Sequence, residues 1–245
     1  MDSTIRPFSP ADVAARPYRY FRRRYVWQWP IRVFHWVNAI AVAALFSTGL
    51  YIANPQLAPA GEPTFHFVMG TVRKVHFAFA YVFLINFLWR IYWFYVGNNF
   101  ARSGVPMVWR RAWWNDLFRQ VWDYLRLERG HVHLGHNALA GCAYTLLVIG
   151  LGWVQLFIGF AMYSQTHTGG MWDRLLGWVI PLLGGPFQAL MWHHLFAWMF
   201  ICFAIVHVYI VFYDGMQFKN GLITSIVSGE KFYTEGDIDS TTWMS

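Results

Sequence analysis

Four long apolar stretches alternate with polar segments along the chain. They cover residues 31–53, 75–96, 137–163 and 191–212. At a rise of about 1.5 Å per residue, each stretch is long enough as a helix to cross a hydrocarbon core of about 30 Å. The pattern predicts an all-α integral membrane protein, in which a single domain forms a four-transmembrane-helix bundle.

The apolar segment 164–190 is not expected to form a fifth span. Prolines and glycines between Pro181 and Pro186 interrupt it, and such residues mark turns. Asp173 and Arg174 shorten its apolar run further. We interpret the segment as a partly interfacial excursion that joins the third and fourth spans.

The basic residues indicate how the bundle is oriented. Of the 19 Lys and Arg residues, seven lie in the N-terminal arm (residues 1–30) or just after it, six lie in residues 97–136, and two lie in the tail, residues 213–245. The arm lacks the apolar run of a cleavable signal peptide. Because Lys and Arg are enriched in cytoplasmic loops, we expect both termini in the cytoplasm and a multi-pass location in a bacterial inner membrane.

Composition supports the membrane class and excludes others. The chain is 57% hydrophobic and 13% charged, against about 25% charged residues in soluble domains. The net charge of +7 lies at the ends of apolar stretches and accompanies no nucleic-acid motif, so we expect lipid contact and no nucleic-acid partner. Cys142 and Cys202 form neither a C-x-x-C nor a C-x-x-C-H motif, and we interpret both as core packing residues.

The fourth span carries the most informative pattern, a histidine near each end. His193 and His207 are 14 residues apart, which at about 100° per residue falls only about 40° short of four turns, so both rings face the same way. His194 faces elsewhere. The two rings are separated by about 21 Å of helix rise and cannot share one ion, but each could ligate its own haem iron. The alternative is that these are interfacial histidines packed against neighbouring helices.

Two further histidines complete a pairing by depth. His35 lies near the inner end of the first span, level with His207, and His76 lies at the outer end of the second, level with His193. Each pair would supply two neutral imidazoles, the axial ligands of a six-coordinate haem b. His66 is a rival ligand on the outer side, but a loop holds a ring less rigidly than a helix does.

Basic and polar residues near these histidines have candidate roles. The anionic haem propionates would meet basic side chains at each membrane surface. The candidates are Arg32 and Arg90 inside and Arg73 and Lys74 outside, with Arg90 expected to reach the surface by snorkelling.

Residues 97–136 supply two more features. Residues 106–129 have the pattern of an amphipathic surface helix, although a simply solvated charged helix is an alternative. His131, His133 and His136 follow it, but their spacing shares no helical or strand face. Interface anchoring or proton uptake suits these three histidines better than metal binding.

Three motifs resemble one known family over nearly the whole chain. They are RVFHWVNAIAVAALFSTGLYI at 32–52, GTVRKVHFAFAYVF at 70–83 and HHLFAWMFICFAIVHVYIV at 193–211. The chain resembles the cytochrome b subunits of membrane-bound nickel-iron hydrogenases, which are related to those of formate dehydrogenases. The resemblance implies two haems b, ligated by His35, His76, His193 and His207. It also implies that electrons arrive from the iron-sulfur clusters of a periplasmic hydrogenase small subunit, itself bound to the large subunit, and leave to a quinone.

Our hypothesis is an electron-transfer subunit that passes electrons from hydrogen oxidation to the quinone pool, while the hydrogen chemistry lies in other subunits. The donor could instead be a formate dehydrogenase or another periplasmic oxidoreductase. A metal or proton transporter is a rival of a different class, but transporters place ionisable groups in mid-membrane, where these spans carry only Cys202. We expect the donor to dock on residues 55–74 and 164–190.

The quinone is expected near the inner haem, which lies farther from the donor. Asn38, His136 and Asn137 are its candidate polar contacts, and His131 or His133 could take up protons there. The alternative is structural: Asn38 bonds to a neighbouring helix, and His136 with Asn137 begins the third span.

Overall fold

The computed structural model describes residues 21–55, 67–128 and 133–233. Most of these residues are helical, and a two-stranded sheet accompanies the helices. The elements in chain order are β1 (Arg22–Tyr25), α2 (Trp29–Ala53), α3 (Val68–Val96), the 3-10 helix η2 (Asn99–Arg102), α4 (Arg111–Arg126), α5 (Ala138–Ala143), the π-helical segment η3 (Tyr144–Gly150), α6 (Leu151–Ser164), α7 (Met171–Leu176), α8 (Val179–Leu182), α9 (Pro186–Phe218), α10 (Leu222–Ser228) and β2 (Glu230–Tyr233).

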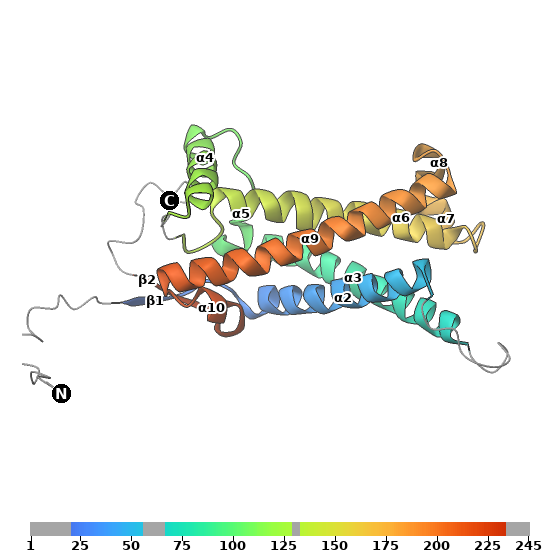
Figure 1. The fold of residues 1–245 in the computed structure, drawn as a ribbon, viewed down its shortest axis with the longest axis horizontal. Helices are drawn as coiled ribbons and strands as arrows, with labels where there is room; N and C mark the ends of the chain where they lie inside the picture. Colours follow the sequence, from blue (N-terminus) through green and yellow to red (C-terminus); the bar gives the residue numbers. More distant parts are fainter. Residues whose placement is uncertain (1–20, 56–66, 129–132, 234–245) are drawn as a thin grey trace, which may run out of the picture.

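Four long helical segments run side by side and form an elongated bundle (Figure 1). They are α2, α3, the continuous unit α5–η3–α6, and α9, and within the described residues these four are long and apolar enough to cross a membrane. We call the end of the bundle that carries β1, β2, α4 and α10 the sheet end, and the opposite end, with α7 and α8, the cap end (Figure 1). Successive helices therefore run in alternating directions between the two ends.

Two helices extend beyond their predicted bounds. α3 begins at Val68 instead of residue 75, and α9 runs from Pro186 to Phe218 instead of 191–212. Pro186 is the first residue of α9, where its fixed φ suits a helix and its missing amide hydrogen costs nothing. The predicted bounds followed the hydrophobic run, whereas the backbone hydrogen bonds continue into polar residues beyond the apolar core.

The segment between the third and fourth spans forms short helices at the cap end. α7 and α8 are 6 and 4 residues long and are separated by turns. Gly184 and Gly185 then adopt φ values of 91° and 116°, which only glycine takes easily, and reverse the chain into α9. The glycines therefore separate this segment from the fourth span.

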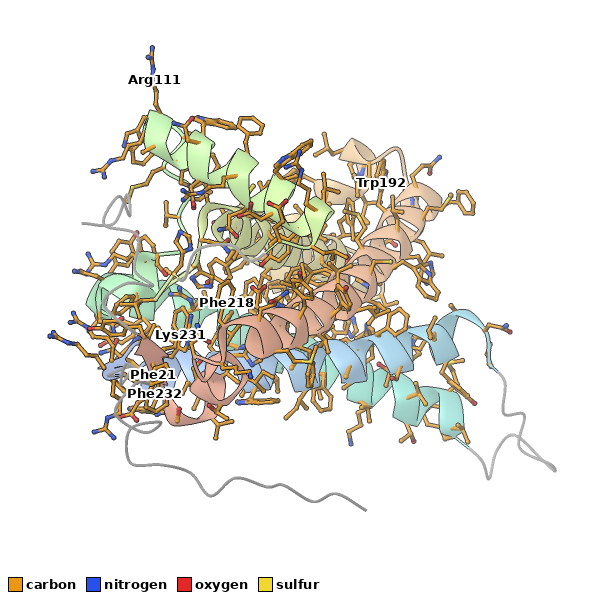
Figure 2. The ribbon with its side chains drawn as sticks, turned by 60° about the vertical axis from the view of Figure 1, so that its left-hand side comes forward. Phe21, Arg111, Trp192, Phe218, Lys231 and Phe232 are labelled. Atoms are coloured by element: carbon orange, nitrogen blue, oxygen red, sulfur yellow. The ribbon has the colours of Figure 1, made fainter. Side chains whose placement is uncertain are left out.

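α4 is the predicted amphipathic helix, shorter than residues 106–129. It ends at Arg126, and the left-handed backbone of the following residue, Leu127, closes the last turn. Its outward face exposes Trp114, Phe118 and Trp122, at helical spacing. Figure 2 shows α4 across the sheet end, with Arg111 pointing away from the bundle.

A small sheet joins the two ends of the described chain, which the sequence pattern did not indicate. β1 pairs antiparallel with β2, with Arg22 opposite Tyr233 and Tyr25 opposite Glu230. Pairing between segments about 200 residues apart leaves no local periodicity to detect. The consequence is that the sheet closes one end of the bundle.

Buried polar side chains fasten the helices at the sheet end. Asn86 donates from Nδ2 to the carbonyl of Phe34 at 3.0 Å, which ties α3 to α2. Gln28 Oε1 accepts from Trp93 Nε1 at 3.1 Å and from the amide of Asn98 at 2.9 Å. Each bond satisfies polar groups that would otherwise be costly to bury.

Two sequence expectations are wrong. Arg90 does not snorkel to the surface: it is 6% exposed and donates from Nη2 to the carbonyl of Ala101 at 2.6 Å, because the chain after α3 folds back over it. Cys202 is exposed on α9 and lines the larger cavity, so it is not a core residue. An apolar run in the sequence does not imply burial in the core, because a membrane helix also presents residues to cavities and to lipid.

Close packing between α3 and α6 depends on one glycine. A Cβ at Gly152 would overlap the ring of Phe87, which is fully buried in the main core cluster. We expect Gly152→Ala to destabilise the bundle by about 1–3 kcal/mol through overpacking. The thermal transition of the purified protein in detergent measures this, with Val154→Ala, at an exposed position of α6, as control. Equal transitions for the two variants would contradict the packing argument.

Candidate functional site

One histidine pair lies towards the sheet end of the bundle. His35, on α2, and His207, on α9, have ring centres 6.3 Å apart with the ring planes at 51°. His35 Nδ1 is buried and has no hydrogen-bond partner among the described residues. Two helices far apart in sequence thus bring two imidazoles together, as their matched depth predicted.

The second pair lies towards the cap end. The ring centres of His76, on α3, and His193, on α9, are 6.5 Å apart. His76 Nδ1 lies 2.8 Å from Thr48 Oγ1, whose own hydrogen bond goes to the carbonyl of Ala44 at 2.6 Å. Because that hydroxyl has only one proton, it accepts from His76 Nδ1, which leaves Nε2 of His76 as the basic nitrogen that can bind a metal.

The spacing of both pairs fits an iron held between two imidazoles. With each nitrogen about 2 Å from the metal, and each ring centre about 1.1 Å beyond its nitrogen, the ring centres would be about 6.2 Å apart. The observed 6.3 and 6.5 Å agree with that value. Within the described residues there is no cluster of three or more His, Cys, Asp or Glu side chains, so this donor set suits an axially ligated haem better than a bare ion.

Each pair opens into an apolar cavity. The cavity at the sheet end has a volume of about 830 Å³ and is lined by His35, His207 and helices α2, α5, η3 and α9. The cavity at the cap end, with His76 and His193, measures about 260 Å³. A Cβ at Gly159 on α6 would lie only 3.2 Å from His193 Cε1, so that glycine leaves room for the ring.

A buried cation faces the larger cavity. Arg90 lines it, and its Nη1 atom is buried with no hydrogen-bond partner among the described residues. Its guanidinium carbon lies 5.9 Å from the ring centre of Phe34 and 5.5 Å from that of Tyr144. A buried guanidinium with a free donor is suited to an anionic group such as a carboxylate. This unsatisfied donor fits a haem propionate in the cavity.

The other propionate candidates lie in different surroundings. Arg73 lines the smaller cavity, with its guanidinium carbon 5.9 Å from the ring centre of Phe77. Arg32 donates from Nη1 to the carbonyl of Val227, and so ties α2 to α10. Lys74 is exposed. Arg90 and Arg73 are therefore the two placed to meet an occupant of a cavity.

The three candidate quinone contacts all line the larger cavity, but their polar atoms differ in how far they are already engaged. Asn38 Oδ1 is buried with no hydrogen-bond partner among the described residues. Asn137 is engaged at both ends: Oδ1 accepts from the amide of Ala140 at 2.7 Å, and Nδ2 donates to Gln120 at 3.1 Å. Asn137 therefore caps α5, and Asn38 is the better placed to receive a hydrogen bond from an occupant.

His136 is held in place at the cavity wall. Its Nδ1 atom lies 2.9 Å from Ser103 Oγ, and its ring stacks on Tyr144 with 5.3 Å between ring centres. Burial, together with the positive charges of Lys231 and Arg90, lowers the pKa of His136 to about 3. The ring is therefore neutral at neutral pH.

Three candidate histidines remain: His66, His131 and His133. His66 and His131 lie outside the described residues. His133 is not an interface anchor: it is buried, with Nε2 3.3 Å from Asp116 Oδ1 on α4. Burial would raise the pKa of Asp116, but the hydrogen bond and charge of His133, with further hydrogen bonds, hold it below its usual range.

Sequence reasoning missed several residues that shape the site. Tyr124, on α4, and Tyr144, in η3, both line the larger cavity, and Thr48 orients His76. The π-helical turn of η3 lies along the same cavity, and such turns often occur at functional sites. No local sequence signal marks any of these, because each role depends on which helix lies opposite.

Comparisons with known proteins agree with this geometry. A sequence model of the family described as prokaryotic cytochrome b561 matches residues 26–229. A protein of Azotobacter chroococcum named probable Ni/Fe-hydrogenase B-type cytochrome subunit is 39% identical over 216 residues, which cover 86% of this chain and 89% of the relative. One of the same name from Cupriavidus necator is 37% identical over 215 residues, with 86% and 88% covered. The probable Ni/Fe-hydrogenase 1 B-type cytochrome subunit of Escherichia coli K12 is 31% identical over 225 residues, with 88% and 94% covered.

Single histidine variants test the two pairs. His35→Ala, His207→Ala, His76→Ala and His193→Ala are each expected to lose or disturb one haem, because one axial ligand is removed. His194→Ala should keep both haems, since the ring of His193 is the one that faces His76. Pyridine haemochrome content and reduced-minus-oxidised spectra measure this. Loss of a haem from the His194 variant but not from the His193 variant would overturn the assignment.

Arg90 variants test the charge facing the larger cavity. Arg90→Gln should lower the midpoint potential of the haem at the sheet end by tens of millivolts, the order expected when a unit charge leaves a buried site. Arg90→Lys keeps the charge and should stay near the wild-type potential. Spectroelectrochemical titration gives these values, with the exposed Arg102→Gln as control. An unchanged midpoint potential in Arg90→Gln would show that the charge of Arg90 does not act on the haem.

Proposed function

Because the chain belongs to the prokaryotic cytochrome b561 family, which implies b-type haem, we propose that it is the dihaem cytochrome b subunit of a membrane-bound hydrogenase. It would anchor a periplasmic nickel-iron hydrogenase and carry electrons from hydrogen oxidation to the membrane quinone pool. The observation that supports this best is the arrangement of four histidines as two facing pairs, one towards each end of the bundle. The relatives whose names mention Ni/Fe hydrogenase support the choice of donor.

Four residues would hold the two haems. His35 and His207 would ligate the one at the sheet end, and His76 and His193 the one at the cap end. A haem with two imidazole ligands supplies one-electron transfer and leaves no coordination position for oxygen or substrate. Thr48 fixes the tautomer of His76, and Arg90 offers a free donor to an anionic substituent.

The distribution of basic residues supports an orientation for the bundle. The sheet end carries the basic segments that precede α2 and follow α3, and we place it in the cytoplasm. The cap end then faces the periplasm. There α7 exposes Met171 and Leu175, and the following turn exposes Trp178, an apolar surface on which the hydrogenase small subunit would dock.

The larger cavity is the proposed quinone site. Because His35 and His207 line the same cavity, its volume of about 830 Å³ would hold the haem as well, and quinone would bind beside that haem against the wall formed by Asn38, His136 and Asn137. Asn38 Oδ1 would accept a hydrogen bond from a hydroxyl of the quinol product, and neutral His136 and Asn137 complete the polar wall. Electrons would thus leave near the cytoplasm while hydrogen oxidation releases protons outside, so turnover would build a membrane potential.

A formate dehydrogenase or another periplasmic oxidoreductase remains the alternative donor, because the haem geometry would be the same. Hydrogen and formate as alternative reductants separate the two, since only the cognate complex reduces its haems. Family membership favours electron transfer over a metal or proton transporter.

A quinone-analogue inhibitor tests the proposed exit site. Added to the hydrogen-reduced complex, it should block electron exit while both haems stay reducible, because it occupies the cavity beside only one of them. The spectrum of the haem held by His35 and His207 should shift. If the shift is confined to the haem held by His76 and His193, quinone is reduced at the other end of the bundle.

A further inference from the structure

We propose that Tyr124 and Asp214 form the proton relay that serves the larger cavity. The inference rests on the proposed quinone reduction and assigns its proton donor. Tyr124 lines the cavity, and its hydroxyl donates to Asp214 Oδ2 at 2.7 Å. The pair joins α4, outside the bundle, to α9, which carries His207.

One face of α4 holds Tyr124 in place. Asp116, Gln120 and Tyr124 follow one another at intervals of four residues and therefore share a face of the helix. Asp116 Oδ2 accepts from the amide of Ala138 at 3.0 Å, and Gln120 bonds to Asn137. Each polar group on this face bonds to an element at the cavity wall, so Tyr124 is docked there rigidly.

The pair sits between solvent and the cavity. Both Tyr124 and Asp214 are half-buried, so the carboxyl group can exchange protons with solvent while the phenol borders the cavity. Three neighbouring groups influence the pair electrostatically or by hydrogen bonding: Tyr213, Asn137, and Lys231 of β2. The ring centre of Tyr213 lies 6.4 Å from that of Tyr124. Lys231 is buried at the sheet end (Figure 2), and burial lowers its pKa to about 8, an effect that Asp214 partly opposes.

The electrostatics favour transfer in one concerted movement. Burial, reinforced by the charge of Asp214 and the hydrogen bond to it, raises the pKa of Tyr124 above its usual value. The phenol is therefore protonated at neutral pH, and can give up its proton only as it receives another. Asp214, which accepts from Tyr124 in this structure, delivers that second proton after it has itself taken one up from solvent, when the hydrogen bond between the two groups reverses and the phenol O–H turns towards the cavity.

Two cycles of proton transfer through Tyr124 and Asp214 supply the two protons that reduction of one quinone needs. Quinone takes up two electrons and two protons, and each carbonyl oxygen ends with one O–H bond. In each cycle the Tyr124 O–H bond breaks as its proton passes to a quinone oxygen, and the Asp214 carboxyl proton restores the phenol. Asp214 is then reprotonated from the cytoplasm. The reductant would be the b-type haem that His35 and His207 are proposed to hold, a one-electron donor.

Asp214→Asn separates the relay from a purely structural hydrogen bond. The asparagine carbonyl still accepts from Tyr124, so α4 stays attached to α9, but the amide cannot carry the proton. Reduced protein is mixed with a soluble short-chain benzoquinone or naphthoquinone, and haem oxidation is followed by stopped flow. We expect at least a tenfold slower oxidation at pH 7, with unchanged haem content and midpoint potentials. The rate should fall about tenfold per pH unit as pH rises, because protons now come directly from solvent, while the wild-type rate changes less.

Two further variants and a spectroscopic readout complete the test. Tyr124→Phe should show the same slow oxidation, whereas Tyr213→Phe, next to Asp214 but not at the cavity, should match the wild type. Infrared difference spectra between the oxidised and reduced protein should contain a carboxyl C=O band that is absent in Asp214→Asn. This readout needs no quinone turnover.

The outcomes distinguish the relay from the proposed function. If quinone oxidises the wild type rapidly, and both Asp214→Asn and Tyr124→Phe keep the wild-type rate and pH profile, the relay is wrong but quinone reduction stands. Failure of any quinone to oxidise the reduced wild-type protein would overturn the proposed function, and the relay with it. Slow oxidation in both variants, with the infrared band lost in Asp214→Asn, would establish the relay.

Discussion

The structure depends on the cost of placing polar side chains inside an apolar bundle. An imidazole or a guanidinium away from water loses hydrogen bonds that lipid cannot replace, so each such group needs a partner. Here Asn86 bonds to the backbone of α2, and Arg90 bonds to the chain that folds over it. Three of the residues with a buried atom that has no partner among the described residues, His35, Asn38 and Arg90, line the larger cavity. These unsatisfied groups are suited to an occupant of that cavity.

α9 is the element through which the parts of the site are connected. It carries one histidine of each pair, 14 residues apart, and near its end it carries Asp214, which bonds to Tyr124 of α4. α2 and α3 supply the partner histidines, one from each helix. A shift of α9 along its axis would therefore alter both pairs and the α4 contact together. α8 and α10 pack against α9, so these contacts help to fix the position of both histidine pairs.

The sheet end combines roles that seem separate in the sequence. η2, α4 and α10 contribute Phe100, Tyr124 and Ile226 to the wall of the larger cavity, and β2 packs against α10 at the same end. The segment before α5 supplies neutral His136, β2 supplies buried Lys231, and α4 supplies its polar face. The proposed quinone site and its proton relay therefore combine these segments with residues of the spans, such as Asn38 of α2 and Asp214 of α9.

The sequence by itself determined the four spans, the excursion at 164–190 and the depth of each histidine. These follow from hydrophobic length and helical periodicity, which are local properties of the chain. The facing of His193 and His207 followed from their spacing alone. The motifs also carried the resemblance to hydrogenase cytochromes, and the family match at residues 26–229 confirms it.

Only the tertiary structure decided which side chains meet. The pairing of β1 with β2, the burial of Arg90, the exposure of Cys202 and the contact of Tyr124 with Asp214 all join or separate residues through the packing of different elements. A lipid-facing and a core-facing position look alike in an apolar helix, because lipid and protein interior are both apolar. Rotation of each helix about its axis, and the return of loops over its ends, are set by contacts distant in sequence, and no local pattern records them.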